Sequence, residues 1–257
     1  MRCALSVVVP AFNEAGKIAG TIRQIADYLG ERKLAGEILV VDDGSRDATA
    51  VEAAAAPHGD VPLRVIRNPR NEGKGAAVRR GVLAARGDRV LFTDVDLSVP
   101  LGEFDRFAAA LDDGADIVIG SRRLGGSPLR RWFRGLGVSY QSRIKVHQPF
   151  YREILGEAYQ KLTLMLLGLD IRDANCGFKG FRGDVARRVF EKVTVPQWGF
   201  DAEVLVIAKR HGFRVAELEV EWHNDASSRV NLLSAPFSSL AELVRVKRND
   251  RRRRYAP

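Results

Sequence analysis

Apolar and polar positions change their spacing in a regular way along the first half of the chain. Short continuous runs of β-branched and other apolar residues alternate with longer segments in which apolar residues recur every three or four positions. The short runs are typical of buried strands and the longer segments of helices. Strands are predicted at 5–9, 38–41, 63–66 and 117–119, and a fifth runs from Arg89 up to Asp94. Strands alternating with helices predict an α/β fold with a mostly parallel sheet flanked by helices.

The helix expected after the first strand has the clearest pattern. One face is formed by Ile18, Ile22, Ile25 and Leu29. This spacing places all of them on a single helical stripe. Pro10 is expected to end the preceding strand, and Asn13 to cap the helix through its short polar side chain. Further helices are predicted near 47–57, 78–83 and 104–111.

From about Gly125 the alternation gives way to aromatic residues mixed with basic ones, and then to more helices. Helices are predicted at 153–167, near 185–190 and from 198 onward, followed by a strand at 215–222. A last amphipathic helix carries Phe237, Leu240, Leu243 and Val244. No apolar run reaches the roughly 18 residues of a membrane-spanning helix. The N-terminus enters a strand directly, so we expect no signal peptide.

Polar residues suited to ligand binding gather where the predicted strands end. They are Asn13 and Glu14, Asp42 and Asp43, Asn71 and Lys74, Asp94 and Asp96, and Arg122. The carboxyl ends of parallel strands meet at one edge of the sheet, where open α/β sheets bind their ligands. Five independent loops with such residues therefore predict a binding site along this edge. There is no G-x-x-x-x-G-K-[ST] motif, which excludes a P-loop nucleoside triphosphatase (NTPase).

Two carboxylates one residue apart follow the strand that begins at Arg89. Alternate residues of a strand point the same way, so Asp94 and Asp96 can converge just past its end. Paired carboxylate oxygens suit a hard divalent cation, Mg²⁺ or Mn²⁺. The alternative is a polar turn that caps a helix.

The formal net charge of +9 is concentrated in two regions. Residues 117–152 contain eight basic residues and no acidic one, and residues 245–254 contain seven basic residues and one acid. Such regions favour anionic partners, namely phosphates, lipid headgroups or nucleic acid. A solvated basic surface is the alternative. The two cysteines have no metal-like spacing, which indicates a reducing compartment.

Four ordered motifs resemble glycosyltransferase family 2. They are Val-Val-Val-Pro-Ala-Phe-Asn-Glu at 7–14, Val-Asp-Asp-Gly-Ser at 41–45, Asp-Val-Asp-Leu-Ser at 94–98 and Gly-Ser-Arg at 120–122. Three later motifs resemble the dolichyl-phosphate glucosyltransferase branch: Cys-Gly-Phe-Lys at 176–179, Phe-Asp-Ala-Glu at 200–203 and Ser-Arg-Val at 228–230. The last motif has arginine where that branch usually has lysine, the 125–145 segment is longer than usual, and the spanning segment of many relatives is absent.

The resemblance implies a GT-A fold that acts as one catalytic domain. Residues 1–124 would form the sugar-nucleotide half and residues 125–257 the acceptor half. It also implies transfer of a hexose, glucose from UDP-glucose by the Cys-Gly-Phe-Lys match, to polyprenyl or dolichyl phosphate. GDP-mannose as donor and a soluble hydroxyl acceptor are the alternatives. A non-enzymatic nucleic-acid-binding protein is a more distant one, because strand-end aspartates repel phosphate unless a metal is present.

Roles follow from the resemblance position by position. Donor-binding residues would be Pro10, Phe12, Glu14, Asp43, Lys74 and Asp94. Asp94, Asp96 and Ser98 would hold the metal on the diphosphate, and Arg122 and Arg152 would meet the acceptor phosphate. Structural alternatives exist for Pro10 as a strand end, for Glu14 as a residue of the first helical turn and for Asp43 as a turn cap.

The catalytic set implied by the resemblance is Asp96, Arg122 and Asp201. The reaction would be a single displacement with inversion at the sugar carbon C1. An alcohol acceptor needs a general base. A phosphate monoester has its second pKa near ~6 and is largely dianionic at neutral pH. With a lipid phosphate, Asp201 or Glu203 would therefore orient and shape the site, and a base role is the alternative.

The last helix and the basic residues after it predict where the protein acts. An apolar stripe next to clustered arginines is typical of a helix lying on an anionic membrane surface. We therefore expect a cytoplasmic protein, peripheral on the cytoplasmic face of the membrane. The alternative is that the same stripe, Phe237, Leu240, Leu243 and Val244, packs on the protein core.

Overall fold

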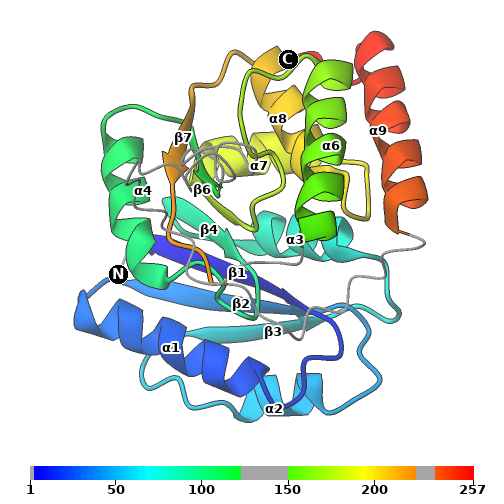
Figure 1. The fold of residues 1–257 in the computed structure, drawn as a ribbon. Coiled ribbons are helices and arrows are strands. Elements are labelled where there is room, and N and C mark those ends of the chain that lie inside the picture. Colours follow the sequence, from blue (N-terminus) through cyan, green and yellow to red (C-terminus); the bar gives the residue numbers. More distant parts are fainter. Residues whose placement is uncertain (1–2, 123–149, 224–234) are drawn as a thin grey trace, which may run out of the picture.

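A single seven-stranded sheet organises the computed structural model, which describes residues 3–122, 150–223 and 235–257 (Figure 1). The strands are β1 Leu5–Ala11, β2 Gly36–Asp42, β3 Leu63–Arg67, β4 Arg89–Thr93, β5 Ile117–Ser121, β6 Phe178–Arg182 and β7 Val215–Glu219. Their order across the sheet is β3-β2-β1-β4-β6-β5-β7. Only β6 runs against its neighbours in this sheet. The predicted α/β fold with a mostly parallel, helix-flanked sheet is confirmed.

Helices cover both faces of the sheet. They are α1 Ile18–Glu31, α2 Thr49–Ala55, α3 Lys74–Ala84, α4 Phe104–Asp112, α6 Phe150–Leu167, α7 Gly183–Lys192, α8 Phe200–Arg210 and α9 Ala235–Arg251. The alternation of β1 divides the core, since Val8 faces one layer while Val7 and Val9 face the other. The first layer packs against α3, α7 and α8, and the second against α1, α2 and α4.

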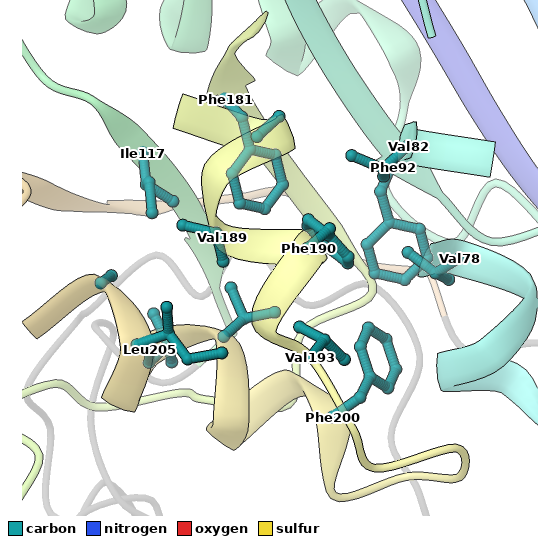
Figure 2. Packing of buried hydrophobic residues seen from close by; sticks show 14 of the residues in the cluster. Val78, Val82, Phe92, Ile117, Phe181, Val189, Phe190, Val193, Phe200 and Leu205 are labelled. Carbon is teal, nitrogen blue, oxygen red and sulfur yellow. The ribbon is translucent and has the colours of Figure 1, made fainter. Parts of the chain in front are cut away.

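The core under α3, α7 and α8 is rich in aromatic residues. Figure 2 shows Phe92 of β4, Phe190 of α7 and Phe200 of α8 gathered with valines of α3. Phe92 and Phe200 meet edge to face with ring centroids 5.8 Å apart. Such pairs contribute about 0.5–1.5 kcal/mol beyond their buried area. This core fixes the positions of the carboxyl end of β4 and of the first residue of α8, which lie at the functional edge of the sheet.

Two predictions for the first loop are wrong. Pro10 does not end β1, which continues to Ala11 and pairs there with β2. The Ala11 carbonyl accepts the Asp43 N–H, so the alternate residue Pro10 faces β4, whose pairing with β1 ends at Val8. A proline is tolerated there because no ladder bond is lost. Asn13 does not cap α1, because Lys17 holds the cap position.

Asn13 instead ties two loops together. Its backbone is left-handed, with φ of 55°, a conformation that asparagine tolerates better than most residues. The Asn13 side-chain oxygen accepts the Arg46 N–H at 2.9 Å, and the Asn13 backbone N–H donates to the Ser45 hydroxyl at 2.9 Å. The loops after β1 and β2 are therefore fixed to each other at the edge of the sheet.

Strand β6 was not predicted. Its sequence, Phe-Lys-Gly-Phe-Arg, contains a lysine and a glycine at positions that the fold buries. Gly180 packs closely against α4, since a β-carbon there would lie 3.2 Å from the Phe107 ring, a tight contact. Lys179 is buried because Asp201 neutralises it. Neither reason is visible in the hydrophobic pattern of the segment, because both depend on residues far away in the sequence.

The predicted basic tail is largely part of the folded domain. Helix α9 reaches Arg251, and Val246 and Tyr255 are buried in the core. Leu243, which we placed on the membrane stripe, also packs inside, whereas Leu240 and Val244 are exposed. The Phe237 side chain lies outside the described part. Over the described residues, no helix is both long and apolar enough to cross a bilayer.

Candidate active site

A cleft of about 610 Å³ opens along the carboxyl edge of the sheet. Its walls include the predicted residues Pro10, Phe12, Glu14, Asp43, Lys74, Asp94, Asp96, Ser98 and Arg122. Loops after β1, β2, β3, β4 and β5 all contribute, as parallel topology requires. Two predicted residues are not among them. Asp201 lies behind the cleft, and the Arg152 side chain is outside the described part of the chain.

The loop after β4, which carries the two carboxylates, has a defined conformation. The Asp96 carboxylate accepts the Ser98 N–H at 3.0 Å, and the Thr21 hydroxyl donates to the Val95 carbonyl at 2.6 Å. Gly177 lies directly against this loop, where a β-carbon would overlap the Asp94 carboxylate. Thr21 and Gly177 together set where Asp94 points.

Lys74, the first residue of α3, forms an ion pair with Asp94 at 2.6 Å. Burial lowers the pKa of Lys74, but the carboxylates of Asp94, Asp201 and Asp96 outweigh it, and the pKa lies above its usual value. The amine is therefore charged at neutral pH. It also lies 4.9 Å from the ring centre of Trp198. Lys74 thus balances the acidic loop at the bottom of the cleft.

The carboxylate pair fits a cation that is shared with a substrate. Within the described residues, no three His, Cys, Asp or Glu side chains converge on one point. Mg²⁺ in proteins usually takes one or two carboxylates and completes its shell with waters and substrate phosphates. The Asp94 side chain is 35% exposed and Asp96 is exposed, so both can reach such a cation. The donor set therefore suits Mg²⁺ or Mn²⁺ bound together with a diphosphate.

Arg122 is held by a partner that the sequence did not indicate. Its Nε and Nη2 donate to the Asp173 carboxylate at 2.8 and 3.0 Å, and its backbone N–H donates at 3.1 Å. Asp173 is fully buried, and the Arg122 side chain remains 27% exposed. Burial lowers the pKa of Arg122, but Asp173 more than offsets this, so the guanidinium stays charged. The pair presents a fixed cation to the cleft.

Asp43 is engaged mainly with the protein. Its carboxylate accepts the Asn68 side-chain amide at 2.6 Å, the Glu72 N–H at 3.0 Å and the Gly73 N–H at 2.7 Å. These bonds shape the turn that leads into Lys74. The structure therefore supports the turn-cap interpretation of Asp43, while the residue still lines the cleft.

Asp201 and Glu203 are buried and do not line the cleft. Asp201 pairs with Lys179, whose amine also donates to the Cys176 carbonyl at 2.6 Å. Burial raises the pKa of Asp201, opposed by Lys179 and Lys74. Glu203 accepts N–H groups of Thr194 and Val195 at 2.9 and 2.8 Å. Both carboxylates act within the protein, as expected for residues that shape the site.

Several cleft residues were not among the predicted site residues. They are Asn175, Cys176, Gly177, Gln197, Trp198 and Trp222. Trp198 is 43% exposed in the cleft. Cys176 is buried, and burial raises its pKa to about 11, which makes it an inert packing residue at neutral pH. Cys176 and Gly177 belong to the motif at 176–179 and Asn175, Gln197 and Trp198 lie close to the motifs at 176–179 and 200–203, whereas nothing in the sequence indicated Trp222.

The fold is that of the GT-A glycosyltransferases. Among solved structures, the chain is similar to glucosyl-3-phosphoglycerate synthase from Mycobacterium tuberculosis in complex with Mn²⁺, UDP-glucose and phosphoglyceric acid. The TM-score is 0.60 at 20% identity, covering 95% of this chain and 80% of that one. At that identity the likeness concerns the fold.

The chain belongs to glycosyl transferase family 2, whose sequence profile matches residues 6–190. It is 33% identical to the dolichyl-phosphate beta-glucosyltransferase of Drosophila melanogaster, over 94% of this chain and 72% of that protein. It is 30% identical to the protein of the same name from Homo sapiens, over 93% and 72%. The family predicted from the motifs is confirmed, and the protein is an enzyme.

Proposed function

We propose that this enzyme transfers glucose from UDP-glucose to a polyprenyl or dolichyl phosphate, with inversion at C1, on the cytoplasmic face of a membrane. The observation that carries the proposal is the pairing of two features in one cleft. The carboxylates of Asp94 and Asp96 line the same cleft as the fixed guanidinium of Arg122. A cation site for a diphosphate and a cationic site for a second phosphate are what a donor and a phosphorylated acceptor require.

The donor half of the proposal assigns roles to residues 1–124. Pro10, Phe12, Glu14 and Asp43 border the nucleoside, and Asp94 and Asp96 hold Mg²⁺ or Mn²⁺ on the diphosphate, with Ser98 beside them. The cation, when bound, stabilises the charge that develops on the leaving diphosphate. Lys74 also stabilises the charge on the leaving diphosphate, because its amine lies 2.6 Å from Asp94. A structural neighbour crystallised with Mn²⁺ and UDP-glucose supports this assignment.

The acceptor half uses residues 125–257 together with Arg122. The guanidinium is planar and its orientation is fixed by Asp173, which prepares it for a phosphate monoester. Arg152, in the first turn of α6, is the second candidate, and its side chain lies outside the described part, as does the Ser-Arg-Val motif at 228–230. The names of the relatives support dolichyl phosphate as the acceptor.

In the reaction, a phosphate oxygen of the acceptor forms a bond to C1 as the bond from C1 to the diphosphate breaks. A phosphate monoester is already largely dianionic at neutral pH. The acceptor therefore needs no proton removed, which agrees with an Asp201 that is buried against Lys179. Asp201 supports the site through its charge, close to Lys74 and Asp94.

The direct test is a donor and acceptor panel. Purified enzyme with Mg²⁺ is incubated with labelled UDP-glucose or GDP-mannose, and with polyprenyl phosphate, phosphoglycerate or glycerol as acceptor, before extraction of the lipid phase. We expect label in the lipid phase from UDP-glucose and polyprenyl phosphate. Efficient transfer to a soluble acceptor, without transfer to polyprenyl phosphate, would contradict the lipid acceptor. Transfer from GDP-mannose alone would contradict the donor.

Contact with an anionic membrane is supported by exposed apolar residues beside basic ones. Helices α6 and α9 lie side by side (Figure 1). Met165 of α6 is 81% exposed and Val244 of α9 is 54% exposed, and Leu162 and Leu240 are exposed as well. The arginines at 251–254 are also exposed. Near an anionic surface each basic residue contributes up to ~1 kcal/mol.

Replacing both Met165 and Val244 with glutamate should release the protein from anionic vesicles. The change places two charges on the exposed apolar surface and leaves the core intact, so the fold should be kept. Co-sedimentation with phosphatidylserine-containing vesicles at 0.1 M salt measures the effect, with Val51→Glu on α2 as the matched control because Val51 is 72% exposed. Wild type should also be released at 1 M salt, where the Debye length falls to ~3 Å. Equal pelleting of wild type and the double variant would rule out this surface.

A further inference from the structure

The loop at 193–199, between α7 and α8, carries two residues into the cleft, Gln197 and Trp198. Its backbone is held by two carboxylates that no motif pointed to as partners. Glu203 binds the N–H groups of Thr194 and Val195 at 2.9 and 2.8 Å. The second carboxylate comes from α9, and none of the side chains described for this helix lines the cleft.

Glu242 of α9 binds the part of the loop that carries Trp198. One carboxylate oxygen accepts the Gln197 N–H at 3.2 Å and the other accepts the Gly199 N–H at 2.9 Å. The approach is close, because a β-carbon at Gly199 would lie 2.8 Å from the Glu242 β-carbon. The two hydrogen bonds bracket Trp198 on both sides, so they fix the backbone from which the indole projects.

The opposite side of the loop rests on the start of α3. The Pro196 carbonyl accepts the Ala76 N–H at 3.0 Å. A β-carbon at Gly75 would lie 2.6 Å from the Val195 carbonyl oxygen, so the two backbones are in direct contact. The loop is therefore held between α9 and the first turn of α3, which begins with Lys74. Its Trp198 ring centre lies 4.9 Å from the Lys74 amine.

We infer that Glu242 is a positioning residue for the donor site. Glu242 holds Trp198 against Lys74, and α9 is therefore part of the diphosphate-binding machinery. The inference rests on the proposed function in one respect, namely that the donor binds in this cleft. Glu242 acts through the loop and touches no substrate itself. Its loss should weaken donor binding and leave acceptor binding unchanged, because Arg122 and Asp173 lie on other elements.

The test compares Glu242→Ala, Glu242→Gln and Asp250→Ala. Asp250 is the matched control, since it also lies on α9 and pairs with Arg210 of α8 at 2.6 and 2.7 Å without touching the loop. We expect Glu242→Ala to raise the dissociation constant of UDP with Mn²⁺, and the KM for the sugar nucleotide, about tenfold, the equivalent of about 1.4 kcal/mol. Glu242→Gln, which keeps one acceptor oxygen, should lie between, and Asp250→Ala should match wild type. The KM for polyprenyl phosphate should stay constant.

A spectroscopic readout separates positioning from loss of stability. The chain has three tryptophans, so a 5-fluorotryptophan-labelled protein gives three ¹⁹F signals, and Trp198→Phe assigns one of them. Glu242→Ala should shift the Trp198 signal, and Asp250→Ala should not. If Glu242→Ala does not fold, Glu242→Gln carries the same comparison. An unshifted Trp198 signal, or unchanged UDP affinity in a folded variant, overturns the inference. Wild type that fails to bind UDP contradicts the proposed donor, and the ¹⁹F comparison still decides whether Glu242 positions Trp198.

Discussion

Replacing Asp96 with asparagine should lower sugar transfer about a hundredfold or more while the fold is kept. The loss corresponds to removing one group that stabilises charge in the transition state. Asp96 is exposed, and its only hydrogen bond that the described structure gives is with the Ser98 N–H, which an asparagine oxygen can also accept. The substitution therefore removes the charge and keeps the shape of the loop. Steady-state kinetics with saturating Mg²⁺, together with a thermal melt, measure both quantities.

The control for Asp96 is Asp113→Asn. Asp113 is an exposed aspartate at the end of α4, which leads into the start of β5 at the opposite edge of the sheet. It should change neither transfer nor melting. Treatment of wild type with EDTA should reproduce the loss, and added Mn²⁺ or Mg²⁺ should restore activity. Full turnover in metal-free buffer would contradict the proposed role of the cation.

Replacing Arg122 with alanine should have two large effects. It removes the guanidinium from its ion pair with the fully buried Asp173 carboxylate, and breaking a buried ion pair by removing one partner costs roughly 3–5 kcal/mol. It also removes the guanidinium proposed to bind the acceptor phosphate. The free energy of unfolding should fall accordingly in urea denaturation, and transfer to polyprenyl phosphate should be lost.

A second substitution separates the two effects. Arg122→Ala combined with Asp173→Asn removes the buried charge, so most of the stability should return while transfer stays low and UDP binding stays near wild type. Arg32→Ala is the control, because its bidentate partner Asp105 is 52% exposed and such surface pairs contribute about 1 kcal/mol or less. A stable Arg122→Ala enzyme, or a normal acceptor KM in the double variant, would contradict the assignment.

The position of the cleft could be predicted because it follows from topology. Once strands and helices alternate, the carboxyl ends of parallel strands must meet at one edge. Residues as distant in sequence as Glu14 and Arg122 then line the same cleft. The paired aspartates were predicted from the two-residue period of a strand, but β4 ends at Thr93 and both lie in the turn that follows, from which they still reach the cleft. This is why nearly all the predicted site residues with described side chains line one cleft.

The C-terminal region shows where a local pattern is insufficient. The helix α9 was predicted correctly, but the apolar stripe assigned to it does not lie on one face, and the pattern could not decide which apolar residues pack inside. Leu243 and Val246 enter the core, and Val244 faces outward. Tyr255, four residues beyond the last helical residue, is buried and donates a hydrogen bond to Glu203. A run of arginines around it made this segment look like a free tail.

The sequence alone determined most of the elements, the mostly parallel arrangement of the sheet, the family and the edge of the sheet at which the chemistry lies. These properties depend on periodicity and on residue type, which are local. Tertiary structure alone decided the state of the charged groups. Arg122 meets Asp173 across 51 residues, and Gly199 meets Glu242 across 43. A carboxylate is chemically the same wherever it occurs in a sequence, and only burial and the partners brought to it by folding decide whether it binds a ligand or holds the protein together.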